Sequence, residues 1–142
     1  MNYILDTNVI SELVAAQPDE NVAHWIDSVD PERVFLSVIT IGELKRGIEK
    51  LPDSRRKGEL DRWLNEDLLV RFQDHLLAID VDVMLAWGDL TARLEAVGKP
   101  MPAIDSLIAA STAQSGFTLV TRNVADFAHT GISVFNPWTF QG

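Results

Sequence analysis

Short apolar runs alternate with longer amphipathic stretches along this chain, and this alternation limits the fold more than any other feature. The apolar runs predict strands at residues 3–5, 34–38, 76–79, 118–120 and 132–135. Between them, apolar residues recur at the three- and four-residue intervals of helices. Strands that alternate with helices predict an α/β fold, in which right-handed crossovers build a parallel sheet of four to five strands with helices on both faces.

Two predicted helical stretches lie in the middle of the chain. One is predicted to begin at Thr40 and to stop at Leu51-Pro52, with Glu43 one turn inside it. The next is an amphipathic stretch from about Ser54 to Phe72. Residues 98–102 form a predicted loop, because they contain a glycine and two prolines.

Length and composition predict a single domain, residues 1–142. A chain of 142 residues with 46% hydrophobic content can bury one proper core. No stretch approaches the roughly 18 consecutive apolar residues of a membrane span. The chain also enters the strand Tyr3-Ile4-Leu5 without a secretory leader. We therefore expect a cytoplasmic protein that does not contact the membrane.

The charge distribution and the lack of cysteine limit the functions that the chain can have. A net charge of −9 argues against general affinity for nucleic acid, because phosphates are contacted by Lys and Arg. Seven of the twelve basic residues do lie between positions 45 and 62. Such a mixed run is more often a solvated face, so it supports polyanion binding only weakly. Without cysteine there is no thiolate nucleophile, and a metal ion would be bound by oxygen.

Four acidic residues, Asp6, Glu43, Asp105 and Asp126, stand beside apolar runs. Each also has a purely structural interpretation. Thr40 and Glu43 match a capping box, and the three aspartates could cap helices or turns. Asp6 and Asp105, however, have apolar residues on both sides, where an ionised carboxylate is unfavourable unless it is paired or bound to metal. Together the four residues predict a site for Mg²⁺ or Mn²⁺ that activates water against a phosphodiester.

The segments that carry these acids resemble the motifs of PIN-domain ribonucleases, and more narrowly those of the VapC and FitB toxins of type II toxin-antitoxin systems. The motif-bearing segments are residues 3–12, 37–44, 104–110 and 119–127, and the closing residues 134–138 are also similar. The resemblance covers essentially the full length of the chain. It implies a PIN-like three-layer sandwich, and endonucleolytic cleavage of RNA, with tRNA or another structured RNA as substrate.

The resemblance also assigns roles to individual residues. Asp6 and Asp105 match the principal metal ligands, and Glu43 matches the third acidic residue. The fourth acidic position remains open: Asp126 supplies the carboxylate, or Asn123, which directly follows Thr121-Arg122, fills the position as a neutral group.

Two further pairs of residues are assigned supporting roles. Thr7 and Thr121 are expected to orient the carboxylates. Arg46 and Arg122 are expected to contact the substrate phosphate. The implied partners are a second copy of the chain, a VapB-like antitoxin, and operator DNA that is reached only through that antitoxin.

Two other functions are compatible with parts of the sequence. A haloacid-dehalogenase-like phosphatase also places an aspartate after its first strand, but it needs a second aspartate two residues later, where this chain has Asn8. A receiver-like scaffold would bind a metal ion and a protein without cleaving anything. Neither a Ser-His-Asp triad nor a glycine-rich phosphate loop is recognisable in the sequence.

Overall fold

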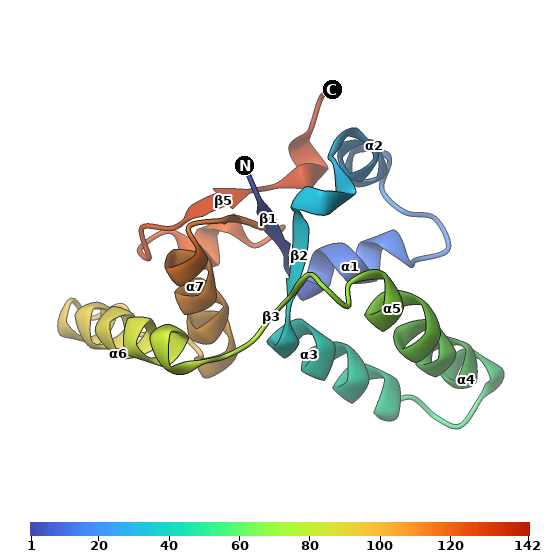
Figure 1. Cartoon of the computed structure of the whole chain (residues 1–142), viewed down its shortest axis with the longest axis horizontal. Helices are drawn as coiled ribbons and strands as arrows, with labels where there is room; N and C mark the ends of the chain where they lie inside the picture. The colour runs from blue at the N-terminus through green and yellow to red at the C-terminus, as the bar shows by residue number, and fades with distance from the viewer.

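A computed structural model describes residues 1–142. Its sheet has five parallel strands in the order β3-β2-β1-β4-β5 (Figure 1). The strands are β1 (Tyr3–Leu5), β2 (Val34–Ser37), β3 (Leu76–Leu77), β4 (Thr118–Val120) and β5 (Ser133–Phe135). The predicted α/β class with a flanked parallel sheet is confirmed.

Helices connect these strands. The α-helices are α1 (Thr7–Leu13), α2 (Glu20–Ser28), α3 (Val38–Glu49), α4 (Arg55–Arg62), α5 (Leu69–Arg71), α6 (Val81–Ala96) and α7 (Ala103–Ser115). The other helical turns are η1 (Pro31–Arg33), the π-helical η2 (Trp63–Leu68), η3 (Val124–Phe127) and η4 (Pro137–Thr139). None of them is both long and apolar enough to cross a membrane.

The two faces of the sheet carry separate cores, because successive strand residues point to opposite sides. Leu5 and Val120 belong to a cluster with residues of α1, α2 and the α3–α5 segment. Ile4 and Leu119, one position earlier in each strand, belong to a second cluster with α6 and α7. Figure 1 shows α6 and α7 on one side of the strands and α1, α2, α4 and α5 on the other.

The stretch from Ser54 to Phe72 is helical, as expected, but it is not one regular α-helix. Its apolar residues recur every four positions, at Leu60, Leu64, Leu68 and Phe72. A helix with 3.6 residues per turn would rotate such a series steadily off the core. The wider π-helical turns of η2 reduce that rotation, so that Leu64, Leu68 and Phe72 all stay buried.

Several boundaries also differ from the prediction: the second strand ends at Ser37 and not at residue 38, and the fifth begins at Ser133 and not at residue 132. The third strand is predicted over residues 76–79 but comprises only Leu76–Leu77, at the outer edge of the sheet. The third helix begins at Val38, two residues before Thr40, because the Ser37 hydroxyl accepts a hydrogen bond from the Ile39 amide at 3.1 Å and caps the helix.

Candidate active site

The carboxyl ends of the two central strands, β1 and β4, place the first site residues. Leu5 of β1 is paired with Val120 of β4, and the Asp6 amide donates to the Val120 carbonyl at 2.9 Å. Asp6 and Thr121 directly follow these paired residues, so they lie side by side at the carboxyl ends of neighbouring strands. Open parallel sheets bind their ligands at this edge.

Asp6 is held firmly by its neighbours. It is only 9% exposed, and it caps α1 with Oδ1, which accepts from the Thr7 amide at 2.9 Å. Its Oδ2 accepts from the Thr121 hydroxyl at 2.9 Å. Burial raises the pKa of Asp6, the hydrogen bonds from Thr121 and Thr7 lower it, and the charges of Glu43 and Asp126 raise it again, so that the net direction is upward.

Asn8 joins these groups, although the sequence did not assign it to the site. Its Nδ2 lies 3.1 Å from the Thr121 hydroxyl and 3.4 Å from Oδ2 of Asp6. Its Oδ1 accepts from the Arg122 amide at 3.2 Å. The only signal in the sequence was its position two residues after Asp6, which places both side chains at the first turn of α1.

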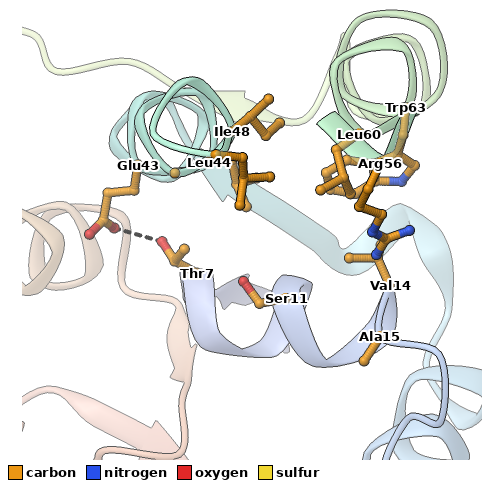
Figure 2. A pocket seen from close by; sticks show the side chains of 12 residues that line it. Thr7, Ser11, Val14, Ala15, Glu43, Leu44, Ile48, Arg56, Leu60 and Trp63 are labelled. Atoms are coloured by element: carbon orange, nitrogen blue, oxygen red, sulfur yellow. Dashed lines mark hydrogen bonds between the residues drawn. The ribbon is translucent and has the colours of Figure 1, made fainter. Parts of the chain in front are cut away.

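Glu43 enters the site from the middle of α3. It is the sixth residue of that helix, and its Oε1 accepts from the Thr7 hydroxyl at 2.6 Å (Figure 2). The capping-box interpretation of Thr40 and Glu43 is wrong, because Ser37 caps the helix and Thr40 is fully buried. The carboxylate of Glu43 is thus free to face α1.

Asp105 lies in the first turn of α7 but does not cap it, since the N-cap position is Pro102. Its side chain has no hydrogen-bond partner. Partial burial raises the pKa of Asp105, and the charges of Asp6, Asp126 and Glu43 raise it further. Asp6 and Asp105 therefore each lie close enough to both Glu43 and Asp126 to be repelled by them, although the four carboxylates come from four separate parts of the chain.

Both candidates for the fourth acidic position, Asp126 and Asn123, lie near the other site residues. Asp126 is exposed on η3, and its charge reaches Asp6 and Asp105. Asn123 precedes η3, and its amide donates to the Thr121 hydroxyl at 3.1 Å. The Asn123 carbonyl accepts from the Asp126 amide at 3.0 Å, so one turn of backbone carries both residues.

The two arginines assigned to substrate binding make no contact with the carboxylates. Arg122 lies over the ring of Trp138, with its guanidinium carbon 5.1 Å from the ring centre. Arg46 is exposed on α3 and forms no ion pair.

The cluster of Asp6, Glu43, Asp105 and Asp126 is negative and carries no counter-charge of its own. No basic side chain forms an ion pair with any of the four. No group of three or more acidic or imidazole side chains lies close enough together to hold an ion as the side chains stand. A Mg²⁺ ion keeps several waters and uses only one or two carboxylates, so this oxygen-only donor set fits it better than an ion that needs a full protein cage.

A groove of about 390 Å³ between α1, α3 and α4 reaches the cluster at Glu43. Figure 2 shows Leu44 and Ile48 of α3 and Leu60 of α4 directed into it, with the Arg56 side chain extending from α4 towards α1. Gly47 also lines the groove, and a Cβ atom there would meet nothing within 4 Å. The groove is predominantly apolar and open to solvent.

Known proteins of one family are similar to this chain. The PIN domain family matches residues 3–132. The chain is similar to VapC ribonuclease Y4jK of Sinorhizobium fredii, at 36% identity over 95% of this chain and 96% of that protein. It is 37% identical to toxin FitB of Neisseria gonorrhoeae, over 95% of this chain and 97% of the toxin. A solved FitAB complex bound to a DNA fragment contains a chain that superimposes with a TM-score of 0.92, at 34% identity, over 99% of this chain and 98% of that chain.

Proposed function

The chain belongs to the PIN-domain family, and on this basis we propose that it is a metal-dependent endoribonuclease, the toxin of a type II toxin-antitoxin pair. The observation that carries the proposal is the group of four carboxylates at the carboxyl edge of the sheet, in which the charges of Glu43 and Asp126 help to raise the pKa of Asp6 and Asp105, and which has no basic partner. Relatives named VapC ribonuclease and toxin FitB support the activity and the biological role. The site of action would be the cytoplasm.

Mg²⁺ or Mn²⁺ is the proposed cofactor. Asp6 and Asp105 would hold it, with Glu43 and Asp126 contributing directly or through water. When bound, such an ion lowers the pKa of a water nucleophile and neutralises charge on the scissile phosphate. Asp126 is favoured over Asn123 for the fourth position because its charge already acts on both Asp6 and Asp105.

Two threonines hold the carboxylates of Asp6 and Glu43 in fixed orientations. The Thr121 hydroxyl donates to Asp6 and accepts from Asn8 and Asn123, so its single proton is committed to the carboxylate. The Thr7 hydroxyl donates to Glu43 at 2.6 Å, a much shorter contact than its 3.4 Å approach to the Thr40 hydroxyl. A carboxylate held in this way loses little freedom when it binds its ligand, which favours a preorganised site.

RNA is the proposed substrate, with tRNA or another structured RNA as its class. Arg46 follows Glu43 by one turn of α3 and has no acidic partner, so it is available for a substrate phosphate. Arg122 lies over Trp138 and would have to leave that ring to take the same role. The phosphatase and scaffold alternatives have no support from the family match.

The direct test is cleavage of labelled tRNA and of total RNA by the purified chain. We expect cleavage with Mg²⁺ or Mn²⁺, and its loss when EDTA is added. The double substitution Asp6→Asn, Asp105→Asn should abolish it, while Asp82→Asn, an exposed acidic residue of α6, should leave it unchanged. Undiminished cleavage by the double variant would count against the proposal.

The apolar groove is the proposed site for a VapB-like antitoxin. An apolar segment could lie between Leu44, Ile48 and Leu60 and approach the α3 backbone closely at Gly47. Its end would then lie beside Glu43 and block the cluster. The further expectation is that operator DNA is reached only through the antitoxin; the solved FitAB complex on a DNA fragment supports DNA binding by such a pair.

A second copy of the chain is the proposed partner of α6. Val81, Met84 and Leu85 of this helix are exposed at one-turn spacing. Gly88 continues the row, and a Cβ atom there would meet nothing within 4 Å, which permits close helix approach. Sedimentation should show a dimer that Leu85→Glu dissociates and that Val70→Glu, an exposed aliphatic residue on α5, does not. A monomeric wild-type chain would refute this part.

A further inference from the structure

A second, smaller hollow meets the acidic cluster at Asp126. It has a volume of about 120 Å³ and lies between the end of α6, the loop that follows it and the turn after η3. Lys99 and His129 line it together with Asp126, and Leu94 and Thr130 form its buried floor. We refer to it as the lysine pocket.

Both walls of the lysine pocket are fixed by hydrogen bonds. Gly98 ends α6 with φ at +72°, and the Lys99 amide donates to the Leu94 carbonyl at 2.8 Å. On the opposite wall, the Arg93 guanidinium donates to the His129 carbonyl at 3.2 Å and to the Thr130 carbonyl at 3.1 Å. The backbone that carries Lys99 and His129 is therefore held in place rather than loosely exposed.

The ammonium group of Lys99 has no acidic partner. Lys45 and Lys57 are both in ion pairs, whereas Lys99 forms none, not even with Asp126 in the same pocket. The other three lysines all lie between positions 45 and 57. Lys99 is thus the one lysine in the pocket beside Asp126, and its hydrogen-bond donors are free.

We propose that Lys99 and His129 bind a phosphate of the RNA strand next to the phosphate that is cleaved. This inference rests on the proposed ribonuclease activity and names a substrate-positioning site for it. Lysine donates strong charge-assisted hydrogen bonds to phosphate, and an imidazole N–H adds a second donor.

The position of Asp126 explains why the occupant is a polyanion. A free anion in this pocket would be repelled by Asp126 and by the other carboxylates. A nucleic-acid strand is held at several points, so contacts elsewhere offset that repulsion. The pocket therefore discriminates between a phosphate in an RNA chain and inorganic phosphate.

The test compares Lys99→Gln and His129→Gln with Lys99→Arg, which keeps the charge, and with Arg33→Gln. Arg33 is an exposed, unpaired cation just before β2, at the end of the sheet opposite the site. RNA binding is measured by fluorescence anisotropy, and kcat and KM are measured for cleavage at several salt concentrations. Thermal melts check that each variant is folded.

We expect Lys99→Gln to weaken RNA binding and raise KM by about tenfold, with kcat nearly unchanged, as for one lost charge-assisted contact. The dependence of log binding constant on log salt should fall by about one unit. His129→Gln should have a smaller effect in the same direction, Lys99→Arg should restore binding, and Arg33→Gln should change nothing.

Three outcomes would overturn the inference. Equal RNA affinity in Lys99→Gln and wild type would exclude the contact. If inorganic phosphate binds the wild type and this binding is lost in Lys99→Gln, the pocket is a site for free anions. A wild-type chain that neither binds nor cleaves RNA would remove both proposals. A chain that binds RNA through Lys99 without cleaving it would refute only the ribonuclease activity.

Discussion

The two hollows that meet the acidic cluster differ in size and in chemistry. The groove, which adjoins Glu43, is about 390 Å³ in volume and is lined mainly by aliphatic side chains of three helices. The lysine pocket, which adjoins Asp126, is about 120 Å³ and contains an unpaired lysine and a histidine. Apolar surface favours a protein segment, whereas a free cation favours phosphate. Inhibitor and substrate can therefore be recognised by different residues and still compete at one centre.

If the centre is shared, Asp6→Asn should remove activity while leaving both hollows intact. We expect RNA cleavage to fall by about 10³-fold, because a proposed ligand of the metal ion that would neutralise the reacting phosphate is lost. Antitoxin affinity, measured by calorimetry, should stay within about twofold of wild type, since Asp6 does not line the groove. A large loss of antitoxin binding would show that the groove depends on the carboxylate.

Gly47→Phe should impair binding in the groove without affecting the acidic cluster. No atom lies within 4 Å of the missing Cβ, so the fold should tolerate the substitution, but the ring would fill part of the groove. We expect antitoxin affinity to fall by about 100-fold, in the range of hot-spot effects at interfaces, with RNA cleavage retained.

The matched control is Gly58→Phe. Gly58 is also a helical glycine with open space at its Cβ position, but it lies on α4 outside the groove. It should bind the antitoxin like wild type. Equal losses in both variants would indicate that the substitutions disturb the helices and not the groove.

Thr121→Val tests the positioning of Asp6 on the β4 side of the centre. The Thr121 hydroxyl is one of the groups that lower the pKa of Asp6 against the effect of burial. Without it the pKa rises further, so the acid limb of the pH–rate profile should move to higher pH and kcat should drop by about tenfold at neutral pH. Thr118→Val, a buried threonine at the start of the same strand, is the control. An unchanged acid limb would remove Thr121 from this role.

The smallest expected effect is on stability. The folded pKa of Asp105 lies above its ordinary value of 3.8, so the folded chain binds this proton more tightly than the unfolded chain does. The contribution of Asp105 protonation to folding stability is fully present below about pH 3.8. It is lost as the pH rises through the raised pKa of the folded chain.

Asp105→Asn should accordingly raise Tm at pH 7 by roughly 1–3 °C, a small shift because solvent screens this partly exposed group. The gain should vanish near pH 3, and Mg²⁺ should stabilise the wild type more than the variant. Differential scanning calorimetry at both pH values measures the shift. A lower Tm for the variant at pH 7 would mean that the carboxylate makes a favourable contact.

Local patterns predicted the strands and the residues that follow them. Tyr3-Ile4-Leu5 is a buried strand and Asp6 caps the next helix, because both features depend on neighbours within a few positions. Glu43 was harder. The capping box at Thr40 is a valid local pattern, but Ser37 provides the cap three residues earlier, at the end of β2. Ser37 and Thr40 both match local capping patterns, and the end of the β2–β3 pairing at Ser37 decided which of them begins the helix.

Other features depend on contacts between distant parts of the chain. Asn8 contacts Thr121, 113 positions away, and neither residue reveals the other in the sequence. Lys99 appeared only as part of a loop, and its importance depends on Asp126 lying in the same pocket. The π-helical segment was missed because the repeat of apolar residues every four positions was taken for an ordinary α-helix.

The strand order has a consequence for synthesis of the chain. β1, at the N-terminus, is flanked in the sheet by β2 and by β4, which is made more than a hundred residues later. Asp6 therefore gains its Thr121 partner, and the cluster gains Asp126, only after residues 121–126 have left the ribosome. A nascent fragment that stops before β4 would lack a finished centre, so the ribosome that makes the chain would not meet a working nuclease while the earlier elements are being synthesised.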